Sequence, residues 1–405
     1  MHDPKREIEA LRDHLARHDK KIAFLFGAGT SAAINIGPDL ANWKSLIPAV
    51  AELTNDCRSA AETLGEPFKQ AWQAISDECV SRGEDPNIEN LLSRIRFKSA
   101  AIGPSDTLAG LTGEQLEQLE SCVAQTIAQR VTPNTALIPD HIPQDNLARW
   151  CSKTRRRSSL ELFTVNYDIL FERSLEAARI AVFDGFIGSY QPFFDSDAVG
   201  GKAGGPGTDW VRLWKLHGSI NWRWAEFGSE RRVVREQNTD PGEMILPSLH
   251  KYEESRKLPY VALMDRLSAV LEQDDVLMIA CGYSFSDQHI NERIFGALER
   301  NPRTHVVSLT FSDIDLDGSV AEKAGTFKNF SVLCPKGAFI GGSWAEWRLS
   351  QPLDPWFEDA TAGAFSQDDP DADGTPSLTG KLQLGDFGVF CDFLARIADP
   401  TGASS

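Results

Sequence analysis

The sequence Ile22-Ala23-Phe24-Leu25-Phe26 runs directly into Gly27-Ala28-Gly29-Thr30-Ser31. Five apolar residues before a glycine-rich turn predict a buried strand, a turn and the start of a helix, the order of a first nucleotide-binding unit. The glycines let backbone N–H groups approach a pyrophosphate, and the hydroxyls of Thr30 and Ser31 are expected to reach phosphate. The G-x-G-x-x-G pattern is incomplete because Ala32 fills its third glycine position, so a purely structural turn remains an alternative.

Three further segments follow apolar runs in the same way. They are Thr164-Val165-Asn166-Tyr167-Asp168, Lys215-Leu216-His217-Gly218-Ser219 and Cys281-Gly282-Tyr283-Ser284-Phe285-Ser286-Asp287. The pattern predicts strands over 22–26, 160–165, 211–216, 276–280 and 305–309, with helices over 169–179 and 287–298. This alternation predicts an α/β fold, a Rossmann-like parallel sheet with an inserted helical subdomain. Because the carboxyl ends of parallel strands line one crevice, we expect the four segments to meet at one nucleotide site.

The rest of the chain divides into an N-terminal helix, an insertion and a C-terminal extension. Residues 1–19 form an amphipathic helix whose apolar side needs cover from this domain or from another subunit. Within a domain over 20–310, residues 44–150 are the helical insertion, with helices near 44–63, 66–81, 87–100 and 113–130. The glycine-rich stretch 188–209 predicts a mobile loop placed to cover the site. Residues 311–405 contain an acidic linker at 368–374 and an apolar tail near 387–394 that docks as a helix or strand.

Composition narrows the classes of protein. The 405 residues carry a formal net charge of −17, which argues against a broad nucleic-acid footprint and therefore against direct nucleic-acid binding. The basic run at 153–157 is read as a solvated face, or alternatively as a partner contact. With no long apolar run and no signal peptide, we expect a cytoplasmic protein that does not enter the membrane. The 7 cysteines are scattered without a C-x-x-C pair, so neither a disulfide framework nor a zinc or other metal site is expected.

Polar side chains at the strand ends are the candidates for chemistry. Asn166 is suited to bind ribose hydroxyls or water, whereas Asp168 is favoured as a cap of the following helix. His217 lies between a strand and a glycine, and histidine has the pKa for proton transfer near neutral pH. Ser284 and Ser286 are expected to cap the helix over 287–298, and Asp287 either complements the dipole of that helix or binds ribose.

Together, the motifs G-A-G-T-S, T-V-N-Y-D, K-L-H-G-S-I-N-W and G-Y-S-F-S-D resemble the sirtuin superfamily over residues 20–310. The resemblance is closer to its bacterial defence branch than to its protein deacylases. It implies that Asn166 and Asp168 bind the nicotinamide ribose and the attacking water, and that His217 is the general base. The NAD-binding set implied alongside these catalytic residues is Gly27, Ala28, Gly29, Thr30, Ser31, Gly218, Ser219, Gly282, Ser284 and Asp287.

Two departures separate the chain from the deacylases of that superfamily. No cysteine pairs are present to build their four-cysteine zinc ribbon, and their I-P-D-F-R motif is replaced by Ile36-Gly37-Pro38-Asp39-Leu40-Ala41-Asn42-Trp43. The resemblance therefore implies a hydrolase, an NAD glycohydrolase that uses NAD as substrate without zinc. It also implies antiphage (antiviral) defence, a homo-oligomer and a HerA-type ATPase partner. The alternatives are an NAD- or ADP-ribose-sensing regulatory module, and a protein deacylase or ADP-ribosyltransferase.

Overall fold

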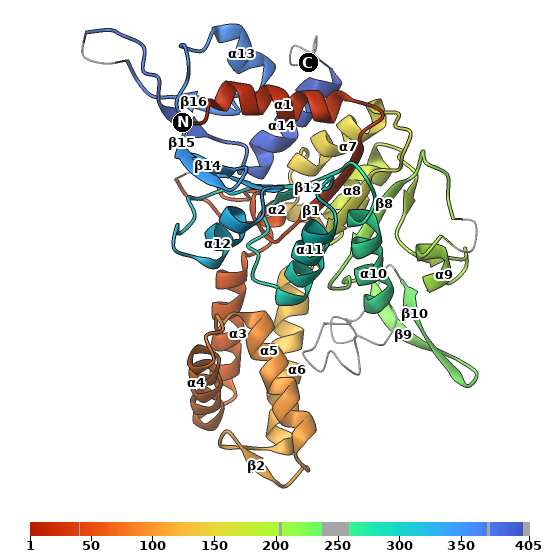
Figure 1. Ribbon diagram of the computed structural model, residues 1–405. Helices are drawn as coiled ribbons and strands as arrows, with labels where there is room; N and C mark the ends of the chain where they lie inside the picture. The colour runs from red at the N-terminus through yellow and green to blue at the C-terminus, as the bar shows by residue number, and fades with distance from the viewer. Residues whose placement is uncertain (40, 202–204, 237–258, 371–372, 400–405) are drawn as a thin grey trace.

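The computed structural model describes residues 1–39, 41–201, 205–236, 259–370 and 373–399. It has an α/β body, which contains the N-terminus and residues 387–398, and a helical body that projects from it (Figure 1). The two bodies correspond to the predicted sheet and the predicted insertion. Their boundary lies near the carboxyl ends of the central strands, which places the insertion beside the predicted site.

A nine-stranded sheet forms the centre of the α/β body, in the order β15-β14-β13-β12-β11-β1-β4-β8-β5. Neighbours from β5 to β13 pair in parallel, and β14 and β15 add an antiparallel edge. The strands are β1 (Lys21–Phe26), β4 (Glu161–Thr164), β5 (Val182–Phe183), β8 (Val211–Lys215), β11 (Val276–Cys281), β12 (His305–Leu309), β13 (Phe330–Leu333), β14 (Gly337–Ile340) and β15 (Ser343–Glu346). The predicted α/β class with a Rossmann-like parallel sheet is confirmed.

The four central strands end level with one another. Phe26 at the end of β1 pairs with Thr164 of β4 on one side and with Cys281 of β11 on the other. Thr164 pairs in turn with Lys215, the last residue of β8. The four polar segments of the sequence therefore leave the sheet at the same edge and at the same height.

Helices cover both faces of the sheet, and the side chains of β1 alternate between these two faces. Ile22, Phe24 and Phe26 point toward α1 (Pro4–Ala16), α7 (Pro143–Lys153), α8 (Leu170–Ala177) and α14 (Phe387–Ala398). Ala23 and Leu25 point toward α10 (Tyr260–Leu271), α11 (Gln288–Arg300) and α12 (Ser319–Thr326). Every residue of β1 after Lys21 is buried, as expected of a central strand in a parallel sheet.

Helix α1 uses its apolar side within this chain. Ile8, Leu11 and Leu15 are buried in the same core as Phe390 of α14. The sequence left open whether this apolar side packs on the same chain or on another subunit, and in the structure it packs on the same chain. The apolar side of α1 consequently gives no support to the predicted homo-oligomer.

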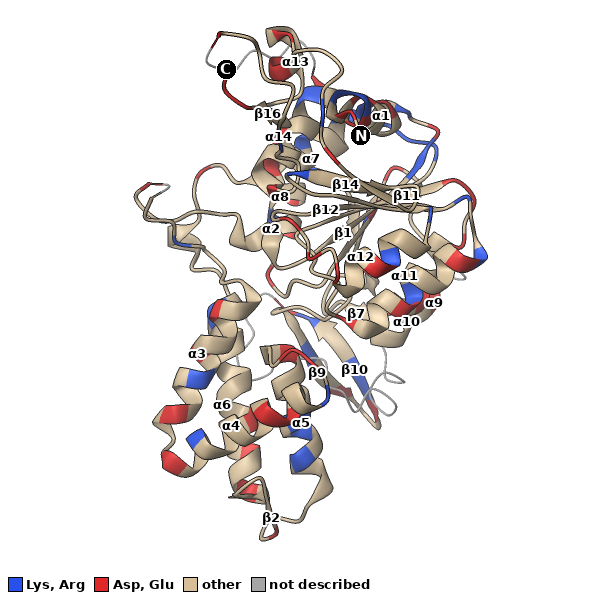
Figure 2. Ribbon diagram, turned by 60° about the vertical axis from the view of Figure 1, so that its left-hand side comes forward, with Lys and Arg blue, Asp and Glu red and all other residues tan. Residues whose placement is uncertain are grey.

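The helical body consists of α3 (Val50–Thr63), α4 (Glu66–Ser81), α5 (Ile88–Ala101) and α6 (Gly113–Val131), around a core of its own. Helix α3 begins later than the predicted residue 44, just beyond Pro48. The short strands β2 (Thr107–Leu108) and β3 (Leu111–Thr112) and the 3-10 turn η1 (Thr135–Leu137) complete it. Basic and acidic residues both occur along its helices, as the blue and red ribbon segments of Figure 2 show. Helix α7, although inside the predicted range 44–150, packs on α14 and α8 in the α/β body.

The stretch predicted as a mobile loop over 188–209 contains regular structure. It includes β7 (Phe193–Phe194) and α9 (Ser196–Val199), and residues 202–204 lie outside the described residues. Strand β7 belongs to a second sheet with β6 (Phe186–Ile187), β9 (Trp222–Phe227) and β10 (Glu230–Arg235). Asp195 caps α9. The prediction of a loop relied on the glycine content and did not consider this helix cap.

The C-terminal extension is part of the α/β body. Strands β13, β14 and β15 widen the main sheet, and α14 is the docked apolar tail. Helix α13 (Pro355–Ala360) and the hairpin of β16 (Phe365–Gln367) and β17 (Gly380–Leu382) lie between them. The predicted acidic linker falls inside this hairpin, with residues 371–372 outside the described part.

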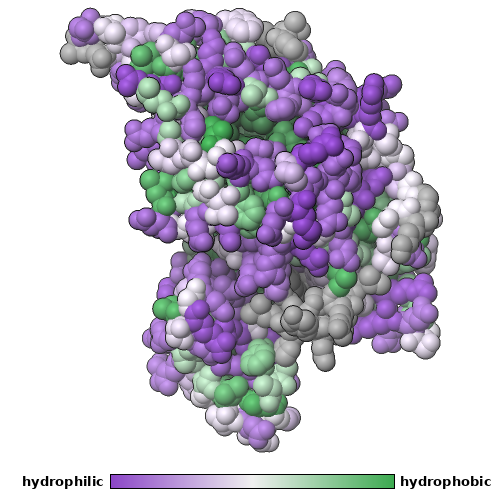
Figure 3. Space-filling view, in the orientation of Figure 1, coloured by the Kyte–Doolittle hydropathy of each residue, from purple (hydrophilic) through white to green (hydrophobic). Residues whose placement is uncertain are grey.

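The face of the molecule in Figure 3 is mostly hydrophilic, with small separate hydrophobic areas. Among the residues that the structure describes, none of the helices has the length and apolar character needed to cross a membrane.

Candidate functional site

The glycine turn after β1 packs against the glycine turn after β11. A Cβ on Gly27 would lie 2.3 Å from the carbonyl oxygen of Gly282, and one on Gly29 would lie 2.8 Å from the Gly282 Cα. The backbone N–H of Gly29 donates to that same Gly282 carbonyl at 3.0 Å. The glycines are therefore needed for close contact between two loops, while a phosphate-binding role for this turn stays a prediction. Ala28 is the N-cap residue of α2 (Gly29–Ala32), which has only 4 residues.

Asn166 joins the β4 segment to the β1 segment. Its side-chain nitrogen donates to the hydroxyl of Thr30 at 3.0 Å and to the hydroxyl of Ser31 at 2.8 Å. Thr30 in turn donates to the Gly27 carbonyl, and Ser31 donates to Asp168 at 2.7 Å. All four side chains are buried. Since the two amide protons of Asn166 are used inside the protein, its Oδ1 is the atom suited to accept a hydrogen bond from a ligand.

Asp168 and Lys215 hold the turn that follows Asn166. Asp168 accepts from the backbone N–H of Leu170, the first residue of α8, at 3.1 Å, although the N-cap position of this helix is Ile169 and not Asp168 as predicted. Lys215, only 2% exposed, donates to the carbonyl oxygens of Tyr167 and Asp168 and pairs with Glu172 at 3.0 Å. A lysine inside an apolar strand was the signal in the sequence for this structural role.

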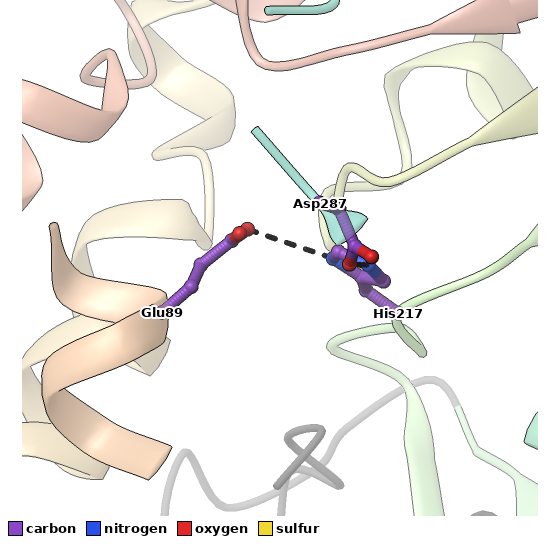
Figure 4. A group of neighbouring side chains, drawn as sticks. All are labelled: Glu89, His217 and Asp287. Atoms are coloured by element: carbon purple, nitrogen blue, oxygen red, sulfur yellow. Dashed lines mark hydrogen bonds and ion pairs between the residues drawn. The ribbon is translucent and has the colours of Figure 1, made fainter. Parts of the chain in front are cut away.

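His217 lies between two carboxylates. Its Nε2 is 3.0 Å from Oδ2 of Asp287, and its Nδ1 is 3.6 Å from Oε1 of Glu89 (Figure 4). The first is a hydrogen bond, whereas the second is an ion pair beyond hydrogen-bond distance, so Nδ1 is buried without a hydrogen-bond partner. The bond to Asp287 assigns the Nε2 proton and leaves Nδ1 as the nitrogen that can exchange a proton with a ligand.

These surroundings change the pKa of His217. Burial lowers the pKa, but the hydrogen bond to Asp287 and the charge of Glu89 outweigh it and raise the pKa to about 9. His217 is therefore an imidazolium at neutral pH in this arrangement. To act as the predicted general base it must first lose that proton.

Glu89 is the site residue that sequence reasoning missed. It lies in the first turn of α5, in the helical body, and Figure 4 shows it pointing from that helix toward His217. An acidic residue in a first helical turn is ordinary, because it complements the helix dipole. Only the packing of the insertion against the sheet brings this carboxylate to His217, so nothing in the local sequence could have indicated it.

The remaining predicted residues lie around His217. Gly218 has a positive φ of 90° and its N–H donates to the Lys215 carbonyl, which turns the chain after β8. The hydroxyl of Ser219 donates to the Tyr167 carbonyl at 3.3 Å, the local bond of a turn. Gly282 also has a positive φ, and its Cβ would lie 2.7 Å from the Thr30 backbone nitrogen. Both glycines have structural reasons to be there.

The predicted caps of α11 are corrected. Asp287 is the N-cap residue and accepts from the backbone N–H groups of His289 and Ile290 through Oδ1. The hydroxyls of Ser284 and Ser286 bond to each other at 2.9 Å and take no part in the cap. An aspartate satisfies two free N–H groups of the helix with one oxygen and keeps Oδ2 for His217, which a serine hydroxyl cannot do.

Glu89, His217 and Asp287 are also the one group in the described residues whose ligand atoms are spaced for a metal ion, all within 4.8 Å of one another. A cation bound by Glu89, Asp287 and the Nε2 atom of His217 would have to replace the 3.0 Å hydrogen bond between His217 and Asp287. Such an ion would compete with the proton on His217.

Residues 160–332 match the family model described as SIR2-like domain. This part of the chain, from β4 to β13, is similar to SIR2-like domains. The matched residues include Asn166, Asp168, His217 and Asp287 but neither the first glycine turn nor Glu89. The match supports an NAD-related function of the sirtuin type.

No curated protein matches this chain. Among solved structures, the chain is similar to a histidine-to-alanine variant of Sir2 with a deacetylated p53 peptide and 3′-O-acetyl ADP-ribose. The two are 14% identical with a TM-score of 0.32, over 76% of this chain and 89% of the other.

Proposed function

We propose that this chain is an NAD glycohydrolase that converts NAD and water into nicotinamide and ADP-ribose. The observation that carries the proposal is a buried histidine, His217, whose Nε2 is fixed by Asp287 at the carboxyl edge of the sheet, within the SIR2-like match. Asn166 lies two residues beyond the end of β4, and His217 two residues beyond the paired end of β8. Equal offsets from paired strand ends place both side chains at the same edge.

Cleavage of the nicotinamide–ribose bond develops positive charge on the ribose. Nicotinamide leaves as a neutral molecule, so no acid is needed to protonate it, in contrast to ordinary glycosidases with two carboxyl groups. The remaining tasks are to position the ribose and water and to stabilise the developing charge. Asn166 Oδ1 is suited to accept a hydroxyl or water proton, and Asp168, held by Ser31, supplies negative charge beside it.

His217 would receive the proton that water loses as its oxygen bonds to the ribose carbon. Its Nδ1 is the available nitrogen because Nε2 is bound to Asp287. A glutamate 3.6 Å from Nδ1 lies where the water must approach, so binding of substrate has to separate Glu89 from His217 or pass between them. The insertion thereby takes part in the access of substrate to the base.

Release of nicotinamide by the purified protein tests this proposal. We expect Asn166→Ala and His217→Ala to reduce turnover by at least about a hundredfold, the size of a lost general base or positioning group. An exposed histidine changed in the same way, His141→Ala, should retain wild-type turnover. Wild-type turnover in either site variant would refute the assignment of catalytic residues.

Product analysis separates the alternatives. With NAD alone, a glycohydrolase gives ADP-ribose and nicotinamide, whereas a deacylase requires an acyl-lysine peptide and an ADP-ribosyltransferase leaves ADP-ribose on a protein. A sensing module binds NAD without consuming it. Formation of free ADP-ribose without peptide is the result that the proposal requires.

We also propose that the activity depletes NAD during antiphage defence, with the chain as a homo-oligomer beside a HerA-type ATPase. The resemblance of the strand-end motifs to the defence branch of the sirtuins supports this setting. Light scattering of the purified protein, and NAD loss with and without a HerA-type ATPase, test it. A monomer with full activity by itself would refute both the assembly and the partner.

A further inference from the structure

A cavity of about 200 Å³ lies at the amino ends of the central strands, the edge opposite to the candidate catalytic site. Lys21 and Val276 are the first residues of β1 and β11, and Glu161 is the first residue of β4. The cavity is further lined by Arg157, Ser158, Ser159, Thr208, Arg212 and Arg266. None of these residues has a role in the proposed hydrolysis.

Positive charge gathers around this cavity. Lys21, Arg157, Arg212 and Arg266 line it, against Glu161 as the one carboxylate among its lining residues. The whole chain has a formal net charge of −17, so this concentration of cations runs against its average composition. Like charges facing one cavity repel one another unless an anion lies between them.

Glu161 does not neutralise these cations alone, because it is already engaged. It accepts from the indole of Trp214 at 2.6 Å and from Nε of Arg266 at 3.2 Å. The guanidinium of Arg212 is 3.9 Å away, beyond hydrogen-bond distance. One carboxylate is thus used by an indole and one arginine, and Arg212 receives only its more distant charge.

The mostly buried side chain of Arg212 has an N–H donor without a hydrogen-bond acceptor. Its side chain is 17% exposed, and it donates to the Pro206 carbonyl at 3.3 Å. Its Nε is buried without a hydrogen-bond partner. Burial, together with the charge of Arg266, lowers the pKa of Arg212 although Glu161 raises it, which reflects a cation that is incompletely compensated.

We propose that this cavity binds a phosphate-class oxyanion, either free orthophosphate or the terminal phosphate of a nucleotide. Arginine forks match phosphate oxygens with paired charge-assisted hydrogen bonds, and the hydroxyls of Ser158, Ser159 and Thr208 supply neutral donors. The volume is below that of a cleft for a whole nucleotide, so the phosphate end is what the cavity encloses.

The site is independent of the proposed hydrolysis. Strand β1 has 6 residues, so its two edges are separated by roughly 20 Å at about 3.3 Å per residue. The basic run at 153–157 gains a role here through Arg157. Its neighbour Arg156 has a different one, since it turns inward and donates to the carbonyls of Leu15 and Arg17 at the end of α1.

Titration calorimetry of the full chain with orthophosphate tests the proposal. Arg157 is exposed, so Arg157→Gln should fold normally, and a thermal melt checks this. The matched control is Arg155→Gln, which removes the same charge from the same exposed run without touching the cavity. Work at about 50 mM salt keeps screening of exposed charges modest. ADP and adenosine, added as competitors, distinguish a nucleotide from free phosphate.

We expect one saturable phosphate site in the wild type, at least about tenfold weaker in Arg157→Gln and within about twofold of wild type in Arg155→Gln. Displacement of phosphate by ADP but not by adenosine supports a nucleotide as the source of the phosphate, and failure of ADP to displace it supports orthophosphate. Absence of saturable binding, equal weakening in both variants, or unchanged binding in Arg157→Gln would overturn the proposal. None of these readings depends on NAD hydrolysis.

Discussion

His217 is an imidazole held between two carboxylates that come from different parts of the chain. Asp287 belongs to the segment after β11, and Glu89 belongs to the insertion. Because both stabilise the protonated ring, the nitrogen that must act as a base is charged at neutral pH. The protonation state of the site therefore depends on where the insertion lies.

We expect Glu89→Gln to lower the pKa of His217 from its value of about 9, since it removes one of the two carboxylates. The ring signals of His217 in an NMR pH titration measure this directly. If His217 is the base, the acidic limb of the kcat/KM profile should move to lower pH by the same amount. The control is Glu117→Gln, an exposed position on α6 that removes the same charge from the insertion. An unchanged His217 titration in Glu89→Gln would show that the ion pair does not form in solution.

Single residues were predictable where their position in a local pattern carries the information. Asn166 and His217 follow apolar strands directly, and parallel strands bring such positions to one edge. The prediction that serines cap α11 was wrong, because serine and aspartate near a helix start can both act as caps and the sequence does not show which one does. Glu89 was not predictable, since its role comes entirely from the packing of a separate helical body.

At the scale of elements, two glycine turns fit together because neither has a side chain at the contact. We expect Gly27→Ala to lower the free energy of unfolding by about 2–4 kcal/mol, because its Cβ would lie 2.3 Å from a backbone oxygen that cannot move aside. Gly325→Ala is the control, because nothing lies within 4 Å of its Cβ and alanine favours a helix. Urea denaturation measures both. Equal stability of the two variants would mean that the turns do not pack as described.

Helix α14 shows that the C-terminal extension is part of the main core. Phe390 is fully buried, with its ring 6.2 Å from that of Phe24 in the central strand. We expect Phe390→Ala to cost about 3–5 kcal/mol of unfolding free energy, and Phe311→Ala, 75% exposed, to cost almost nothing. Thermal or urea unfolding measures the difference. A small cost for Phe390→Ala would indicate that α14 docks only loosely.

Strands were easier to predict than the limits of domains. The apolar runs gave β1, β4, β8, β11 and β12 within one or two residues, because buried parallel strands are continuously apolar. Helix α7 lies within the predicted range 44–150 but packs on α14, because it is amphipathic like its neighbours and only tertiary contacts decide where it packs. Strands β13–β15 were not predicted either, because no recognisable motif follows them in the sequence.

For the whole molecule, we expect metal chelators to leave both the melting temperature and NAD hydrolysis unchanged. The cysteines are free, and none belongs to the one group of described residues whose ligand atoms are spaced for a metal ion. That carboxylate–histidine group uses Nε2 of its histidine for a hydrogen bond. Elemental analysis of the purified protein, before and after chelation, checks this. A stoichiometric metal whose removal lowers the melting temperature would contradict it and would assign the ion to Glu89, His217 and Asp287.

The central claim is that the sirtuin-like site hydrolyses NAD without a second substrate. Proton NMR of NAD incubated with the purified chain, and with the proposed HerA-type ATPase if the chain alone is inactive, follows substrate and both products in one sample. We predict equal amounts of nicotinamide and free ADP-ribose without acyl peptide, and no reaction by Asn166→Ala under the same conditions. The account would be contradicted if the wild-type chain left NAD intact both alone and with the ATPase. It would also be contradicted if NAD were consumed only when an acyl-lysine peptide is added.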